Sequence, residues 1–188
     1  MSSPTTMQAS AADLLAALPH VLAAPKTDAA IAMLCFRPGF GLRSFPGSLS
    51  MTRAGGIAGE RWLTHPWLKL PDGSPDPRIQ VSILPSRVLD LVWRDRVGTV
   101  HPGDPIVADL NMTEANLPPG TLLQVGTAIL RVSDEPNDGC VKWKARYGGA
   151  AMDWITAPEN SALRLRGVLC SIEQDGKVRA ADRIMVLR

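Results

Sequence analysis

Short apolar runs, each ended by glycine, proline or another turn residue, dominate the chain. Residues 31–37 form a compact apolar run that Pro38 and Gly39 end, which is typical of a buried strand. Runs this short are better suited to strands than to helices, which usually need ten or more residues. The same pattern predicts further strands at 48–52, 79–84 and 105–110.

The last third of the chain has the strongest β pattern. Two apolar runs that meet near Gly126 predict a tight hairpin. The dipeptide Asp175-Gly176 is typical of two-residue turns and predicts a second hairpin. The strands concerned are 121–126, 127–132, 168–173, 177–179 and 184–187.

Three segments have helical spacing instead. Residues 10–23 place apolar side chains three and four apart after Ser10, a good capping residue, and Pro19 should end or kink this helix. A second helix should cover about 86–97, with its first serine as the cap, and a third should cover 141–155. Many short strands with about three helices indicate a mainly β protein, a bent, closed or half-closed β-barrel with peripheral helices.

The length of 188 residues fits one domain and is sufficient to bury a core. We expect a tail and helix over 1–30, of which 1–9 is a loose tail, and a single barrel domain over 31–188. Residues 62–78 contain four prolines and should form a long surface loop. Such loops often carry function.

Composition disfavours several classes of protein. Hydrophobic residues make up 45% of the chain and charged residues 20%, which fits a globular rather than a disordered protein. The net charge of +2 argues against a nucleic-acid or membrane-surface partner, since both usually require a strong basic excess. Neither a signal peptide nor a membrane span fits the sequence, so we expect a cytoplasmic protein.

The three cysteines are far apart and include no CxxC pair, which fits a reducing compartment rather than a disulfide framework. The chain also lacks the GxxxxGK[ST], GxGxxG, HExxH and GxSxG motifs. Its three histidines are isolated, which disfavours a histidine-based metal site. In the absence of these motifs, the cysteines are the remaining candidates for chemistry.

The segment 134–148 (DEPNDGCVKWKARYG) contains the clearest candidate for chemistry. Cys140 follows a turn and begins the expected helix, where the helix dipole and nearby cations favour the thiolate. A thiolate is a nucleophile and a ligand for soft metals, but from these residues alone a buried, inert thiol is an equally good interpretation. The cations are Lys142, Lys144 and Arg146.

The other two cysteines and the aromatic residues of this segment favour packing. Cys35 and Cys170 lie within apolar runs and should belong to the core. Trp143 and Tyr147 are four residues apart, which favours a packed helix face over a platform for nucleic-acid bases.

Further polar residues allow two readings each. Arg166, just before a strong strand, could bind an oxyanion, although the residues alone favour a surface salt bridge. Asn116 lies in a polar turn and could be a loop hydrogen-bonder or a ligand contact. The glycine-rich segment 55–61 could cradle an anion, but one glycine cluster is weak support.

Several segments together resemble one family, the MOSC domain, which is named after the C-terminal domain of molybdenum-cofactor sulfurases. The resemblance covers about residues 30–188, and small stand-alone bacterial members also have the preceding helix. Each motif alone is modest, and their order and spacing carry the resemblance. The segments are GGIAGERW (55–62), RIQVSIL (78–84), GDPIVADLNMTEANLPPGTLLQVGTAILRVSDEP (103–136), GCVKWKARYG (139–148) and RLRGVLCSIEQDGKVRAADRIMVL (164–187).

The resemblance implies a strongly bent β-barrel with few helices. It places Cys140 at the family's cysteine position, where the thiol carries sulfur as a persulfide or ligates the molybdenum of a pterin cofactor. It also implies that polar and basic residues hold the cofactor's phosphate and oxo-metal centre. By motif position these residues are Arg61, Asn116, Lys142, Arg146 and Arg166.

The chain also departs from the family pattern. Small relatives often have a histidine shortly before the Gly-Cys pair, where this chain has Asn137, so a possible acid–base or ligand group is missing. The family is associated with pyridoxal phosphate as well. In full-length sulfurases that cofactor belongs to a separate domain, so we expect no pyridoxal chemistry here.

The resemblance thus implies a protein that binds a molybdenum pterin cofactor or carries sulfur for it through Cys140. One alternative is a molybdenum-dependent reductase of N-hydroxylated compounds, which would need a redox partner because the chain has no flavin or iron–sulfur motif. Another alternative is a non-catalytic module that binds a small ligand in the same pocket. The expected partners are a small-molecule cofactor or substrate and a redox or sulfur-donor protein.

Overall fold

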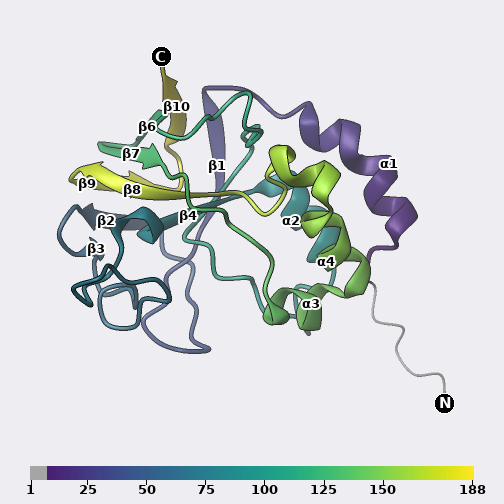
Figure 1. Cartoon of the computed structure of the whole chain (residues 1–188), viewed down its shortest axis with the longest axis horizontal. Helices are drawn as coiled ribbons and strands as arrows, with labels where there is room; N and C mark the ends of the chain where they lie inside the picture. Colours follow the sequence, from purple (N-terminus) through teal and green to yellow (C-terminus); the bar gives the residue numbers. More distant parts are fainter. Residues whose placement is uncertain (1–7) are drawn as a thin grey trace.

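Seven of the short strands pair into a closed barrel in the computed structural model, which describes residues 8–188 (Figure 1). Neighbouring strands are antiparallel except β4 and β5, which are parallel. The predicted tail over 1–9 lies mostly outside the described residues. Around the barrel the strands are β1 (Ala29–Leu34), β10 (Arg183–Leu187), β6 (Leu122–Val125), β7 (Ala128–Val132), β8 (Val168–Gln174), β4 (Val81–Pro85) and β5 (Ile106–Ala108), and β5 closes onto β1.

The parallel pair explains the continuous apolar runs that predicted strands here. Ile83 and Ile106 are completely buried in the barrel core, while Leu84 and Val107 belong to a second core beneath the helices. Both faces of β4 and β5 are therefore covered, which is why neither strand alternates with polar residues. The predicted hairpin at Gly126 is also confirmed, since β6 and β7 pair directly across it.

A second, three-stranded sheet contains β3 (Gly56–Ile57), β2 (Ser48–Thr52) and β9 (Gly176–Arg179), in that order. The predicted hairpin at Asp175-Gly176 is wrong, because β9 pairs with β2 and not with β8. The Asp175 side chain accepts a hydrogen bond from the amide of Arg53, at 2.7 Å, in the turn after β2. This contact links the turn after β2 to the residue that precedes β9, beside the ladder that the two strands form.

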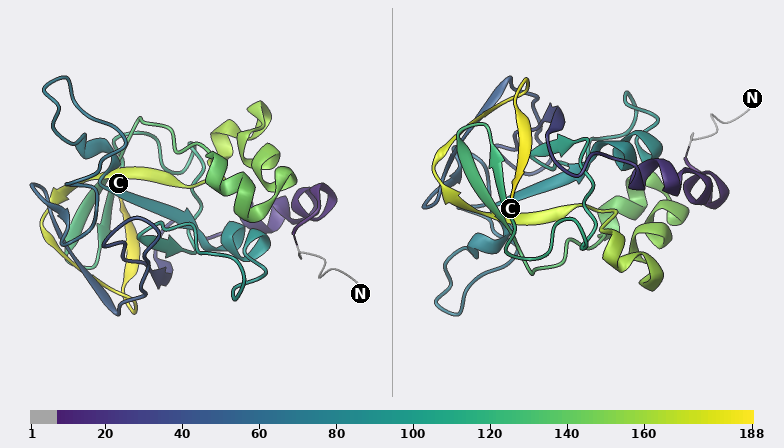
Figure 2. Two further views of the ribbon diagram at one scale, coloured as in Figure 1. Left: turned by 90° about the horizontal axis from the view of Figure 1, so that it is seen from below. Right: turned by 90° about the horizontal axis from the view of Figure 1, so that it is seen from above.

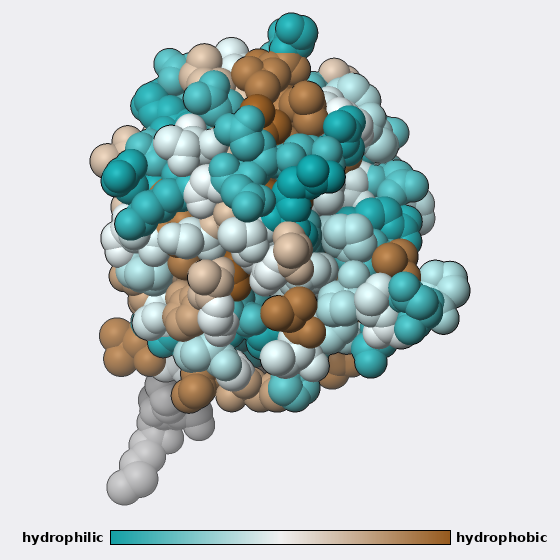
Figure 3. Space-filling view, turned by 90° about the vertical axis from the view of Figure 1, so that its left-hand side faces the viewer, coloured by the Kyte–Doolittle hydropathy of each residue, from teal (hydrophilic) through white to brown (hydrophobic). Residues whose placement is uncertain are grey.

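The outer surface on the side of the second sheet is mixed in character. Figure 3 shows mostly hydrophilic residues there, interrupted by small hydrophobic patches. The inward side chains of this sheet, among them Leu49, Met51 and Val178, join the barrel core. The second sheet therefore extends the core and does not enclose one of its own.

The helices gather on one side of the barrel (Figures 1 and 2). Their inward residues form the second core with the outer faces of β4 and β5. Within residues 8–188, no helix is both long and apolar enough to cross a membrane. The α-helices are α1 (Ala11–Leu22), α2 (Ser86–Val92), α3 (Val141–Tyr147) and α4 (Gly149–Thr156), and short 3₁₀ turns cover Pro77–Ile79 and Pro158–Leu163.

The first helix begins as predicted, and it continues through Pro19. Ser10 and Asp13 form a reciprocal capping box at its start. Pro19 lies inside the helix, so of the two effects expected, ending or kinking the helix, the first does not occur. A proline removes one backbone bond to the residue four before it, here Leu15. Leu15 is 69% exposed, so water can satisfy its carbonyl group.

The other two predicted helices are shorter than expected. The helix predicted over 86–97 ends at Val92, and Pro85, not Ser86, occupies its N-cap position. The helix predicted over 141–155 is two helices, because Gly148 adopts a φ of 95° and both ends α3 and begins α4. The predicted fold class, a mainly β closed barrel with a few peripheral helices, is confirmed.

Candidate functional site

A cavity of about 800 Å³ lies beside α3, and Cys140 is exposed in its wall. We call it the thiol cavity. Loops from distant parts of the sequence build it, together with side chains along α3. Its lining residues are Arg37, Gly39, Phe40, Gly41, Arg43, Arg61, Trp67, Pro102, Glu135, Pro136, Asn137, Asp138, Cys140, Val141, Lys142, Trp143, Arg146 and Arg166.

The lining of the thiol cavity is strongly basic. Two carboxylates, Glu135 and Asp138, face six basic side chains. In a protein whose net charge is only +2, this is a local concentration of positive charge. Such a lining attracts anions. The basic residues are Arg37, Arg43, Arg61, Lys142, Arg146 and Arg166.

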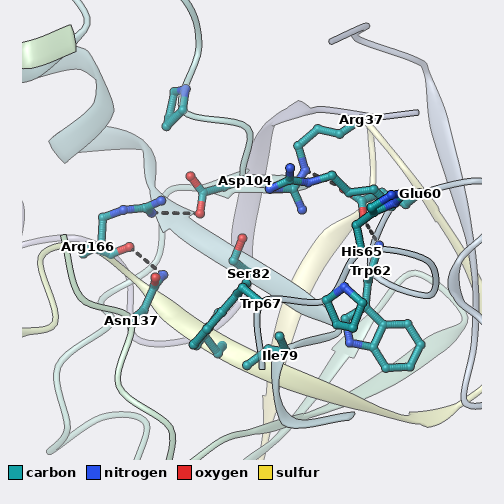
Figure 4. Close-up of a pocket in the computed structure, with 14 residues that line it drawn as sticks. Arg37, Glu60, Trp62, His65, Trp67, Ile79, Ser82, Asp104, Asn137 and Arg166 are labelled. Atoms are coloured by element: carbon teal, nitrogen blue, oxygen red, sulfur yellow. Dashed lines mark hydrogen bonds and ion pairs between the residues drawn. The ribbon is translucent and has the colours of Figure 1, made fainter. Parts of the chain in front are cut away.

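Two of these arginines are neutralised by buried carboxylates (Figure 4). Arg37 pairs with Glu60, whose second oxygen accepts a hydrogen bond from the Trp62 amide at 3.0 Å. Arg166 donates to Asp104 at 2.8 Å. The two pairs lie on opposite sides of a small inner chamber of about 110 Å³, which shares several lining residues with the thiol cavity. Arg37 and Arg166 are thus anchored by the protein itself.

Asp104 remains a carboxylate despite its burial. Its side chain is 2% exposed, and burial raises its pKa. The charge and hydrogen bond of Arg166 outweigh that effect and hold the pKa of Asp104 below its usual range. The guanidinium of Arg166 also lies 4.8 Å from the centre of the Trp143 ring, so Arg166 joins the cavity to the helical core.

The remaining four cations have no carboxylate within ion-pair distance in residues 8–188. Arg61 lies over the Phe40 ring at 4.7 Å, and burial followed by the charge of Arg37 lowers its pKa. Arg43 and Arg146 both donate to the carbonyl oxygen of Pro102. In the described part of the chain, no ion pair therefore balances the charge of these four residues.

The three cysteines differ sharply in their surroundings. Cys140 is exposed, at the N-cap position of α3. Cys35 and Cys170 are completely buried, as predicted. Burial raises the pKa of Cys35 to about 11 and that of Cys170 to about 12. Both buried thiols therefore stay protonated and inert at neutral pH, which leaves Cys140 as the thiol that can react with a ligand.

The structure brings most of the residues suggested by the resemblance together. Cys140 and four of the five candidate cofactor-binding residues line the thiol cavity: Arg61, Lys142, Arg146 and Arg166.

Asn116 is the exception. It is buried and lies outside the cavity lining. Its amide donates to the carbonyl oxygens of Lys26 and Asn111 at 3.0 and 2.8 Å. Its own oxygen accepts from Arg188 at 3.0 Å. These internal contacts connect the segment after α1 to the end of the chain, so we leave Asn116 out of the site.

Sequence reasoning missed two arginines of the cavity. Arg37 and Arg43 come from the irregular segment between β1 and β2, which contains no motif and lies outside every segment that carried the resemblance. Asn137 donates to the backbone oxygen of Arg166 at 3.0 Å. Within residues 8–188, no three His, Cys, Asp or Glu side chains gather as a metal site.

The fold and the cavity define a closed-barrel protein with an exposed thiol among unpaired cations. The fold is shared with YuaD from Bacillus subtilis, at a TM-score of 0.60 and 20% identity over 84% of this chain and 94% of that one. It is also shared with a hypothetical protein, at a TM-score of 0.58 and 19% identity over 85% of this chain and 68% of that one. YiiM from Escherichia coli shares it at a TM-score of 0.51 and 18% identity over 84% of this chain and 69% of that one. These likenesses show the fold. No family model and no curated protein matches the sequence.

Proposed function

We propose that the chain is a MOSC-domain protein that binds a molybdenum pterin cofactor, or carries sulfur for it, in the thiol cavity. One observation carries the proposal: the exposed thiol lines the same cavity as four cations that have no carboxylate partner within residues 8–188. The order of the sequence motifs supports it, and so does the fold shared with YuaD and YiiM.

The donor groups of the cavity fit such a cofactor. A thiolate is a soft ligand that suits a thiophilic metal, and Cys140 can supply it. Arg43, Arg61, Lys142 and Arg146 can hold a phosphate group, because guanidinium and ammonium groups are the usual phosphate partners in proteins. When bound, the cofactor supplies a metal centre for redox chemistry. The chain's own residues orient its phosphate and present the thiol.

The same thiol can carry sulfur without a bound metal. The Cys140 thiolate attacks the terminal sulfur of a persulfide on a donor protein, a Cys140 persulfide forms, and the donor's thiolate leaves. The persulfide is itself anionic near neutral pH, so the surrounding cations stabilise it. Sulfur transfer requires a sulfur-donor protein as partner. A molybdenum-dependent reductase would instead require a redox partner protein.

A second candidate function is a ligand-binding module without chemistry. The unpaired cations favour it as well, since they would hold an anion whether or not Cys140 reacts. The two functions differ in their dependence on the thiol. Cofactor binding or sulfur transfer should be lost in Cys140→Ala, whereas anion binding alone should survive.

The test is molybdenum and sulfane sulfur per chain, measured on protein purified without oxygen from a host that makes the cofactor. Wild type is compared with Cys140→Ala and Lys142→Ala, with Lys144→Ala as the matched control, because Lys144 is exposed on α3 but does not line the cavity. We expect metal or a persulfide mass in wild type and Lys144→Ala, less in Lys142→Ala, and neither in Cys140→Ala. Wild type with neither would leave only the binding module.

A further inference from the structure

Two guanidinium groups from distant parts of the sequence meet at one backbone carbonyl. The Nη2 of Arg43 donates to the Pro102 oxygen at 3.3 Å, and the Nη1 of Arg146 donates to the same oxygen at 3.4 Å. Arg43 lies on the loop between β1 and β2, and Arg146 lies on α3. Burial, followed by the like charge of Arg146, lowers the pKa of Arg43. The fold thus holds two positive charges together against their repulsion.

The loop that carries Pro102 is shaped to permit this approach. Gly103 adopts a φ of 101°, which favours glycine. A Cβ atom there would lie 2.9 Å from Arg37 Cδ and 3.2 Å from Arg43 Nη2. The Gly103 amide also donates at 3.0 Å to Nδ1 of His101, whose side chain is buried. The loop therefore presents the Pro102 oxygen in a fixed place.

The hydrogen-bonding capacity of these two arginines is mostly unused. A guanidinium has five N–H donors. Arg43 makes one hydrogen bond, and its Nε is buried without a hydrogen-bond partner in the described chain. Arg37 and Arg166 differ, because Glu60 and Asp104 already neutralise them. Unused donors and unbalanced charge at one point are the properties of an oxyanion site.

We propose that Arg43 and Arg146 form the seat for a tetrahedral oxyanion, a phosphate group above all, within the thiol cavity. The inference deepens the proposed function, because it names the two arginines that take the charged end of the ligand. It also gives Arg166 a different role from the one the resemblance implied. Arg166 anchors the cavity wall to Asp104 and is not a main anion ligand.

The seat is tested by titrating inorganic phosphate into the full chain at low ionic strength and following the heat of binding. Arg43→Gln and Arg146→Gln should each weaken binding at least about tenfold, the effect of losing one charge-assisted hydrogen bond. The control is Arg179→Gln, which removes the same charge from an exposed residue of β9 that does not line the cavity. This control should bind within about twofold of wild type, because a charge outside the cavity donates no hydrogen bond to the anion and interacts with it only weakly through water.

Arg43→Lys keeps the charge but loses the planar fork, and it serves if Arg43→Gln does not fold. It should weaken phosphate binding while leaving the melting temperature close to that of wild type. Absence of saturable phosphate binding to wild type would overturn the seat. Equal weakening in Arg43→Gln and Arg179→Gln would overturn it too, since that result means general charge attraction.

The titration also separates the seat from the proposed function. In Cys140→Ser, phosphate should bind as it does to wild type, because the seat makes no use of the thiol. If no molybdenum or persulfide is ever found but phosphate binding depends on Arg43 and Arg146, the seat stands and the cofactor proposal fails. If the metal is present but phosphate binding ignores both arginines, the seat fails alone.

Discussion

Cys170 and Cys140 mark the difference between two regions of the molecule, the barrel interior and the thiol cavity. Cys170 is completely buried where β8 pairs with β4 and β7, and burial raises its pKa to about 12. Cys140 is exposed and lines the thiol cavity together with Lys142, Arg146 and other basic residues. The barrel makes a thiol inert by excluding water, and the cavity leaves one open to anions.

The comparison shows where stability and chemistry lie. The barrel core consists of apolar side chains from paired strands, so removing any one of them affects folding. The cavity is built by loops, and it holds charges that repel one another. Between the two regions lie the buried pairs Arg37–Glu60 and Arg166–Asp104, which let charged residues border the core.

Asp104→Ala should destabilise the protein most. The substitution removes the carboxylate that pairs with Arg166, whose side chain is only 15% exposed and therefore poorly solvated. Removing one partner of a buried ion pair costs about 3–5 kcal/mol. Chemical denaturation measures the loss. The control is Asp90→Ala, which breaks a surface pair with Arg96 and should cost less than about 1 kcal/mol. Equal losses in the two variants would mean that Arg166 does not depend on Asp104.

Leu130→Ala tests the barrel alone. Leu130 lies in β7 and is completely buried in the barrel core. A buried leucine replaced by alanine costs about 2–5 kcal/mol through lost burial and a cavity. Phosphate affinity should stay unchanged, because Leu130 is uncharged and does not line the thiol cavity. A loss of phosphate binding at temperatures where the variant is folded would contradict the separation of the two regions.

His101 should make the stability sensitive to pH. Burial lowers its pKa from 6.5 to about 4; nearby Asp104 opposes this, and Arg43, Arg166 and Arg146 reinforce it. The unfolded chain therefore takes up a proton at a higher pH than the folded one. Stability is complete above pH 6.5 and falls as the pH drops toward 4, by about 1–3 kcal/mol.

His101→Gln should be less stable overall but should lose this dependence on pH. Urea denaturation at several values between pH 5 and pH 7 would show a flatter profile for the variant. Parallel profiles for the variant and wild type would mean that His101 is not the group responsible. The carboxylates whose pKa values are lowered, Asp104 among them, begin to lose their stabilising effect below about pH 5. The two profiles are therefore compared between pH 5 and pH 7, where these carboxylates are ionised in both the folded and the unfolded chain.

Much of the barrel could be predicted from local patterns, because its strands are short apolar runs with clear turns. The hairpin at Gly126 and the strand Ser48–Thr52 follow from neighbouring residues alone. The pairing of β9 with β2 does not, since it joins segments that are far apart in the sequence, as the hydrogen bond between Asp175 and Arg53, 122 positions apart, illustrates. Local turn chemistry cannot reveal which distant strand a segment will join.

The candidate site could be predicted only in part for the same reason. Cys140, Lys142 and Arg146 are close in sequence, so one segment pointed to them. Arg43 reaches the same point from a distant, irregular loop, and only the shared Pro102 oxygen shows that it belongs there. The resemblance also suggested Asn116, whose polar atoms are occupied inside the fold.

The central claim is that one thiol, Cys140, is open to anions within a positive cavity while the other two are shielded. The most direct measurement is the rate of thiol modification in the native protein by an anionic and by a neutral aromatic disulfide. The account predicts one fast thiol per chain, absent in Cys140→Ser, with the anionic reagent favoured at low salt and the preference lost as salt screens the charges. Three equally reactive thiols, or a neutral reagent that reacts as fast at every salt concentration, would contradict it.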